Sequence, residues 1–145
     1  MSNIYRFVIS FAFLISLPAC AENITSQANK FWNEFRIAVK KDDYATLEKM
    51  TKFPLSVHGE MDFMPIKKIT KDNFSKEFKK LLDQKIYIET NGKEDVITMR
   101  DAVVSVDKIN NKYNLDRDKH FRVNDLDFVY ENKRWVLFRT YYQEE

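Results

Sequence analysis

Apolar residues recur at helical spacing in three stretches of the first part of the chain. The clearest stretch predicts a helix over 26–41 with Ser26 as its N-cap, because apolar side chains three and four positions apart share one helix face. That face holds Ala28, Phe31, Trp32, Phe35, Ala38 and Val39. The same spacing predicts shorter helices over 43–51 and 72–84. The lysines between 71 and 80 then lie on the solvated face of the third helix.

The middle of the chain contains short extended segments separated by turn residues. Residues 53–59 are predicted to form a strand, with Pro54 at its beginning or at a sheet edge, because proline cannot donate to a ladder. Asn91 and Gly92 predict a tight turn. Residues 96–106 contain a valine-rich run and are predicted to include a further strand.

The last quarter of the chain is the clearest β region. The alternation of apolar residues changes parity between 121–123 and 126–130, which predicts a β-bulge near residues 124–125. Residues 131–133 are predicted to form a hairpin turn. Residues 134–142 are apolar on both faces, as expected of a central strand that is covered on both sides.

The first residues have the order of a secretory signal peptide. A short positive region with Arg6 precedes an uncharged apolar run over 7–17, which as a helix is only about 16 Å long, roughly half the hydrocarbon core of a bilayer. No transmembrane span is therefore predicted. An A-x-A site follows at 19–21, so residues 1–21 are expected to be removed and residues 22–145 to form one exported domain.

Two processing routes remain open for this segment. Cleavage after Ala21 releases a chain that begins at Glu22 into the bacterial periplasm. Alternatively, residues 17–20 resemble a bacterial lipobox, in which Cys20 is lipidated and anchors the protein to a membrane. Pro18 favours the first route, because lipoboxes usually carry a small or β-branched residue at that place.

Composition and charge exclude several classes of function. With 24 Lys and Arg against 22 Asp and Glu, the net charge of +2 provides no strong attraction for nucleic acid. One cysteine cannot form an internal disulfide or a Cys-rich zinc module, and two glycines cannot supply a G-x-G-x-x-G loop for phosphate. Residues 114–118 alternate oxygen ligands like the start of a calcium loop, but Lys119 and Asp125 stand where such a loop needs Gly and Glu. We therefore expect no cofactor and no metal ion.

The order of elements carries a resemblance to a known family. Two helices with the pattern FWNEFRIAVKKDDYATLEKMT lead into FPLSVHG, the helix NFSKEFKKLLDQ follows, and a terminal hairpin ends in NKRWVLFRTYYQ. This layout, over about residues 26–142, resembles secreted bacterial members of the nuclear-transport-factor-2-like (cystatin-like) superfamily. The resemblance implies an α+β fold in which N-terminal helices pack in the concave face of a strongly bent antiparallel β-sheet, forming a cone with an open mouth.

The resemblance also suggests which residue types to consider for chemistry. Enzymes of this superfamily commonly place Asp, His or Tyr inside the cone for proton transfer or dehydration. By type, the candidates here are His58, Asp62, Tyr87, Asp101, His120 and Tyr141. His58 and Asp62 are the most plausible pair, because a turn at Gly59 would bring both to one rim. No spacing demonstrates this geometry, so the sequence assigns no catalytic residue.

Two classes of function fit these observations. The first is a non-catalytic exported binding protein that holds a small apolar ligand or a protein partner, for example by neutralising a toxin in the envelope. The alternative is a small isomerase or dehydratase with a carboxylate or histidine in the cone. The binding protein is favoured, because neither histidine has a partner at a spacing that forces convergence. Titratable groups that converge in one cavity would favour the enzyme.

Export is the first testable expectation. Fractionation of the native host should recover the protein outside the cytoplasm, because the positive region, apolar run and A-x-A site stand in the order that signal peptidase requires. The intact mass then separates the two routes: a first residue of Glu22 indicates soluble release, and a diacylated Cys20 indicates the anchored form. Recovery of an uncleaved cytoplasmic chain would contradict the expectation.

Overall fold

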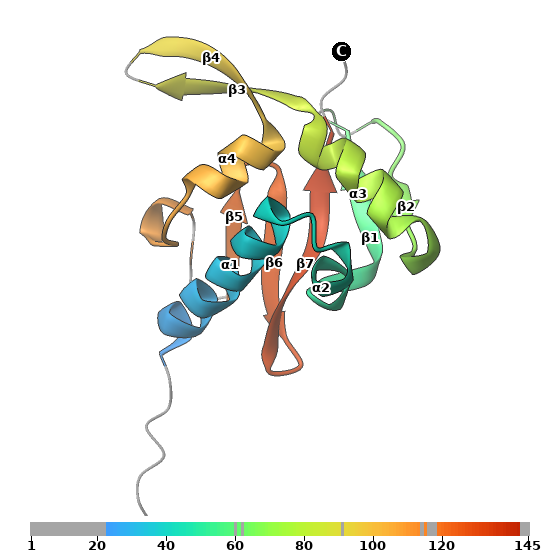
Figure 1. The fold of residues 1–145 in the computed structure, drawn as a ribbon, viewed down its shortest axis with the longest axis vertical. Coiled ribbons are helices and arrows are strands. Elements are labelled where there is room, and N and C mark those ends of the chain that lie inside the picture. Colours follow the sequence, from blue (N-terminus) through green and yellow to red (C-terminus); the bar gives the residue numbers. More distant parts are fainter. Residues whose placement is uncertain are drawn as a thin grey trace, which may run out of the picture.

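The protein has an α+β fold in which helices cover one face of a five-stranded sheet (Figure 1). The computed structural model describes residues 23–59, 61, 63–90, 92–113, 115 and 119–142. The helices are α1 (Ile24–Lys40), α2 (Tyr44–Lys49), α3 (Phe74–Asp83) and α4 (Met99–Ser105). The sheet strands are β1 (Thr51–His58), β2 (Lys67–Ile69), β5 (His120–Val123), β6 (Leu126–Glu131) and β7 (Arg134–Tyr141). A separate hairpin of β3 (Lys85–Thr90) and β4 (Lys93–Thr98) projects from one end of the molecule (Figure 1).

The three predicted helices are confirmed as α1, α2 and α3. The N-cap of α1 is Asn23, whose side chain accepts a hydrogen bond from the Thr25 amide at 3.0 Å, so Ser26 lies inside the helix rather than at its cap. Asp43 caps α2 by accepting bonds from the amide and the hydroxyl of Thr46, at 3.0 and 2.7 Å. These caps satisfy amide groups that have no partner within the helix.

Aromatic rings fill the space between α1 and the sheet. Phe121 and Phe128 stack with their ring centroids 4.7 Å apart, and Phe35 meets Phe128 edge-on at 5.1 Å. The Trp32 ring also meets both phenylalanines edge-on, with its centroid 6.2 Å from that of Phe121 and 5.7 Å from that of Phe128. The four residues predicted to be buried, Trp32, Phe35, Phe78 and Trp135, all lie in this core. The interior that the resemblance assigned to an open cone is therefore packed on the α1 side.

The sheet is mixed, and the expected antiparallel sheet is wrong. In the order β2-β1-β7-β6-β5, the pair β1–β7 is parallel and the other neighbours are antiparallel. Helices and the projecting hairpin connect β1 to β7, so no tight turn forces these two strands to run in opposite directions. The strong bend is also wrong, because the sheet is not strongly curled (Figure 1). The prediction of a central C-terminal strand is confirmed in its position, since β7 lies between β1 and β6, but helices cover only one face of the strand and not both (Figure 1).

Two local predictions about strand ends need correction. Residues 124–125 are not a bulge but the two-residue loop of a hairpin, in which Val123 pairs with Leu126 and Asn124 has a φ of 48°. Paired residues of an antiparallel hairpin point to the same face, which explains the change of parity. Pro54 lies inside β1, at a place where the β1–β7 register shifts.

The valine-rich run over 96–106 is largely helical. Thr98 caps α4 by accepting a bond from the Asp101 amide at 3.1 Å, and its hydroxyl donates to the Asp101 carboxylate at 2.7 Å. Met99, Ala102 and Val103 are buried at helical spacing. Tertiary burial of this face thus outweighs the β preference of valine. The predicted turn lies at the connection between β3 and β4, where Thr90 pairs with Lys93 and Gly92 has a φ of 74°, while Asn91 is outside the described residues.

Replacement of Trp135 by alanine tests the hairpin and the core together. Trp135 is only 4% exposed on β7, so the variant should lose about 3–5 kcal/mol of unfolding free energy through lost burial and a residual cavity. Urea unfolding followed by circular dichroism measures this loss. A loss below about 1 kcal/mol would place Trp135 at the surface and contradict the structure.

Candidate functional site

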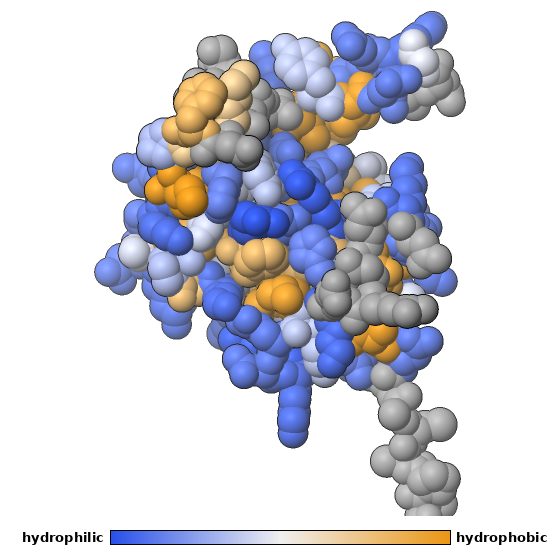
Figure 2. Space-filling model, turned by 180° about the vertical axis from the view of Figure 1, so that it is seen from behind, coloured by the Kyte–Doolittle hydropathy of each residue, from blue (hydrophilic) through white to orange (hydrophobic). Residues whose placement is uncertain are grey.

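The face of the sheet turned away from the helices carries an uninterrupted group of polar and aromatic side chains. Figure 2 views the molecule from this side, where blue surface surrounds an orange patch in the middle of the sheet. Strand alternation places the polar residues of β5 and β6 here, because their neighbours in the strand belong to the core. Arg139 of β7 pairs with Asp127 and therefore lies on the same face. We call the following residues the polar strip: His58 of β1, Arg139 and Tyr141 of β7, Asp127 of β6, and His120 and Arg122 of β5.

Asp127 is the centre of the polar strip and is completely buried. Arg139 donates to its Oδ2 from Nε and Nη2, each at 2.7 Å. His120 Nε2 and Arg122 Nε lie 3.5 and 3.6 Å from the other oxygen, Oδ1, which has no hydrogen-bond partner among the described residues. A buried carboxylate needs neighbours such as the two guanidinium groups, because desolvation of an isolated charge is costly.

Tyr141 joins the two ends of the polar strip. The Arg122 guanidinium carbon lies 4.2 Å from the centre of the Tyr141 ring, and that of Arg139 lies 5.5 Å from it. On the other side, the ring centroids of His58 and Tyr141 are 5.6 Å apart. The contact between His58 and Tyr141 depends on the parallel β1–β7 register, in which these two residues stand directly opposite each other. Four strands thus contribute to one continuous surface.

A cavity of about 380 Å³ lies at the β1 end of the polar strip, beneath the loop that connects β1 to β2. We call it the loop cavity. Its lining consists of His58, Gly59, Met61, Met64, Ile66, Arg139 and Tyr141. Gly59 lets the loop close, because a Cβ at this position would lie 2.2 Å from the Met64 sulfur and 2.6 Å from its Cβ. One wall is therefore apolar and the opposite wall carries a cation, an imidazole and a phenol.

Burial lowers the pKa of His58 below its ordinary value. The positive charges of Arg139 and Lys68 lower it further, and Asp127 opposes them. The imidazole is therefore neutral at neutral pH and presents one donor and one acceptor to the loop cavity.

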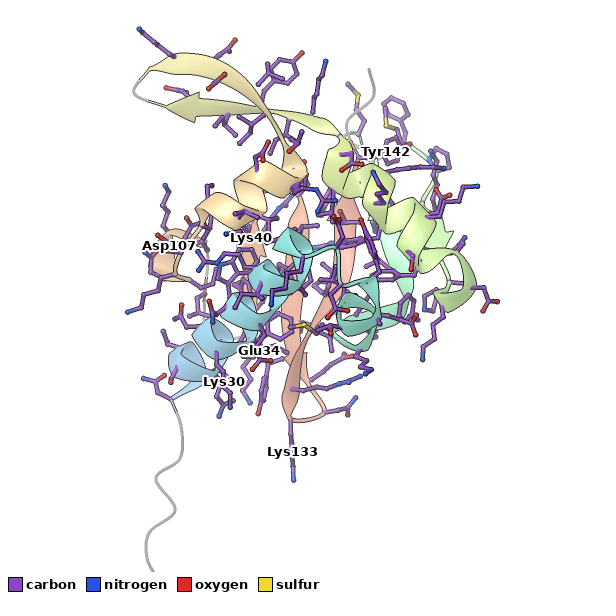
Figure 3. All side chains as sticks on the ribbon, in the orientation of Figure 1. Lys30, Glu34, Lys40, Asp107, Lys133 and Tyr142 are labelled. Carbon is purple, nitrogen blue, oxygen red and sulfur yellow. The ribbon has the colours of Figure 1, made fainter. Side chains whose placement is uncertain are left out.

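Two further hollows lie elsewhere on the surface. One, of about 350 Å³ between α3 and β2, is lined by Lys67, Lys68, Lys80 and Tyr142 with an apolar floor that includes Ile69. The other, of about 400 Å³, lies between α1 and the β6–β7 turn. In Figure 3, Lys30, Glu34 and Lys133 of this second hollow lie toward one end of the molecule, and Tyr142 of the first hollow lies toward the other end. The second hollow is lined mainly by charged and aromatic side chains, which are those of Lys30, Phe31, Glu34, Tyr130, Lys133, Arg134 and Trp135.

The structure brings some of the predicted candidates together and separates the others. His58 and Tyr141 share the loop cavity, and His120 lies at the far end of the polar strip. Asp101 belongs to the cap of α4, and Tyr87 is 72% exposed on the projecting hairpin. The positions of Asp62, of Cys20 and residues 1–21, and of the calcium-like residues Asn114 and 116–118 lie outside the described residues.

Sequence reasoning missed Asp127, Arg122 and Arg139. Asp127 and Arg122 each stand between two apolar residues inside a predicted strand, in the segments LDF and FRV, and Arg139 stands between Phe138 and Thr140 in FRT. That pattern is a usable signal, because a charge at the centre of a strand requires a partner or solvent. The pairing of these three residues is not visible in sequence, since it depends on which strands are neighbours.

Among the described residues, no three His, Cys, Asp or Glu side chains are grouped as a metal site requires. None of the helices in the described ranges is long and apolar enough to cross a bilayer. Comparison of the chain with protein-family models, with curated proteins and with solved structures finds no match. The functional argument therefore depends on the polar strip and the loop cavity themselves.

The titration of His58 tests the geometry of the loop cavity. Its folded-state pKa should lie below the ordinary value of 6.5, as measured by NMR of the imidazole resonances and assigned with His58→Gln. Because the unfolded chain then binds the proton more readily, His58 supports folding above pH 6.5. This contribution disappears as the pH falls through the lower, folded-state pKa. A midpoint at or above 6.5 would contradict the burial of His58 beside Arg139.

Proposed function

We propose that the protein is a small exported binding protein whose loop cavity holds an amphipathic anion. The observation that carries this proposal is the lining of the loop cavity, which sets Arg139, His58 and Tyr141 against the apolar side chains of Met61, Met64 and Ile66. Export and the nuclear-transport-factor-2-like assignment are parts of the same proposal. They are supported by the N-terminal sequence pattern and by the order of the helices and terminal strands.

Arg139 is the residue that we assign to the anionic group. Its Nε and Nη2 bind Asp127, while the described residues offer no acceptor to its Nη1. A guanidinium fixed on one side by a carboxylate is held in place for a charge-assisted hydrogen bond on the other. The neutral His58 and the Tyr141 hydroxyl add donors at the same end of the loop cavity.

The local charge also favours an anion. Of the two guanidinium groups of the polar strip, that of Arg122 lies near the carboxylates of Asp127 and Asp125, while that of Arg139 also borders the loop cavity. An anionic ligand would therefore meet the positive charge of Arg139 without displacing its ion pair with Asp127. The volume of about 380 Å³ is near the lower end for ligand cavities, which indicates a small molecule with a short apolar part.

An acid–base enzyme of the isomerase or dehydratase type is the second candidate. His58 and Tyr141 converge in the loop cavity with their ring centroids 5.6 Å apart. The lowered pKa of His58 also favours the neutral imidazole, which is the form that a general base needs. The binding protein takes precedence for two reasons. The described lining contains no carboxylate, and the nearby Asp127 is engaged by Arg139.

Octanoate and octan-1-ol provide a matched pair of probes for the proposed function. Residues 22–145 should bind octanoate at least about tenfold more tightly than octan-1-ol in isothermal titration calorimetry, because only the carboxylate gains the charge-assisted bond to Arg139. His58→Glu should weaken octanoate binding by about tenfold or more, since it places a second carboxylate beside the guanidinium.

Val96→Glu is the control for this experiment. It makes the same change of charge on β4, where Val96 is 47% exposed and distant in sequence from every residue of the loop cavity. It should leave octanoate binding unchanged. Equal affinity for the two probes, or equal loss in the two variants, would refute the proposed site.

A further inference from the structure

The loop between β1 and β2 exposes three large apolar side chains, of which Met61 and Ile66 also line the loop cavity. Met61, Phe63 and Ile66 are 55%, 81% and 53% exposed, and we call these three residues the loop patch. Figure 2 shows orange surface over this loop at the upper left of the molecule. Single exposed apolar residues are ordinary, but three within six positions of one loop are unusual and favour an interaction site.

Lysines lie directly beside the loop patch. Lys67 and Lys68 follow Ile66 in the chain, and Lys80 of α3 faces them across the hollow of about 350 Å³. We call Lys67, Lys68 and Lys80 the lysine border. Glu77 lies among these groups, and its pKa is lowered by its bond to Lys80, at 2.9 Å, and by the charges of Lys80, Lys76 and Lys67.

The charge of this region is positive as a whole. Residues 67–85 contain seven lysines and three acidic residues, whereas the complete chain has a net charge of only +2. Two of the three acids, Glu77 and Asp83, are already paired with Lys80 and Lys79. Residues 67–85 therefore carry a net charge of +4, which the loop acids Glu60 and Asp62 reduce to +2 over residues 60–85.

We propose that the loop patch and the lysine border together dock onto the surface of an anionic lipid bilayer. The apolar side chains enter the boundary between headgroups and acyl chains, and the lysine ammonium groups bind lipid phosphates. In the sequence, Glu60 and Asp62 alternate with the apolar residues of the loop and oppose deep insertion. Docking is therefore interfacial and reversible, and it depends on anionic lipid.

The composition of this surface favours a bilayer over a protein partner. The centres of protein interfaces are enriched in Tyr, Trp and Arg and depleted in Lys. Here the basic residues beside the loop patch are all lysines, whose flexible ammonium can reach a phosphate in any orientation. Phe63 is the most exposed of the three apolar residues and does not line the loop cavity, so docking does not depend on the proposed ligand.

Vesicle co-sedimentation tests the proposal with residues 22–145, which include the whole described core from Ala28 to Leu137. This chain also lacks the apolar run over 7–17, which would itself enter vesicles. We expect binding to vesicles of phosphatidylcholine mixed with phosphatidylglycerol, much weaker binding to phosphatidylcholine alone, and a loss of binding as salt is raised. Phe63→Ser should reduce the partition coefficient about tenfold, and Lys67→Glu should reduce it at least severalfold.

Two variants serve as matched controls. Tyr87→Ser removes another exposed aromatic side chain, 72% exposed on the β3–β4 hairpin, and should bind like the parent chain. Lys30→Glu makes the same charge reversal as Lys67→Glu toward the opposite end of the molecule (Figure 3) and should have a much smaller effect. Circular dichroism verifies that each variant is folded.

Several results would overturn the proposal. These are no binding to the mixed vesicles, binding that ignores salt and anionic lipid, or equal losses in Phe63→Ser and Tyr87→Ser. A protein partner at this surface would give the first of these results. Phe63→Ser should keep its affinity for octanoate, so a failure of docking is distinguishable from a failure of the proposed ligand site.

Discussion

The parallel pairing of β1 with β7 is the interaction on which the rest of the structure depends. It sets Ser56 opposite Arg139 and His58 opposite Tyr141. Two further backbone bonds, from Leu137 to Met50 and from Tyr142 to His58, at 2.9 Å each, hold both ends of the pair. Without this register, the histidine and the arginine of the loop cavity would belong to unrelated surfaces. The same pairing directs the β1–β2 loop beyond the end of the sheet, where its apolar side chains meet solvent.

The packing of the core determines which face of the sheet can carry a functional site. Rings of α1, β5 and β6 occupy the side that faces the helices, and a close-packed aromatic interior leaves little room for a ligand. On the outer side, Asp127 is buried among basic residues instead. A buried ion cluster contributes little net stability, because desolvation offsets much of the attraction. Its clearest consequence is geometric: Asp127 fixes the Arg139 guanidinium at the edge of the loop cavity.

Features that depend on neighbours in the chain were accessible from sequence. The three helices, the turns at Gly92 and at Asn132 and Lys133, the strand beginning near Phe53 and the burial of Trp32 follow from local spacing and turn chemistry. The incorrect secondary-structure predictions also have physical causes. The run that contains Val103 became a helix because burial of one face outweighed local β preference. The bulge expected at Asn124 is a hairpin turn, which produces the same change in the alternation of apolar residues along the chain.

By itself, the sequence determined the α+β class, most of the elements and the apolar core, since these depend on periodicity within short segments. His58 and Tyr141 were recognised as candidates by residue type, but their contact was not predictable. Only the tertiary structure decided strand order, the direction of β1 against β7, and the meeting of Asp127 with Arg139. These contacts join positions far apart in the chain, and many strand orders would bury the same apolar residues equally well. The site was therefore decided by which strands pair, a property that no local pattern of residues contains.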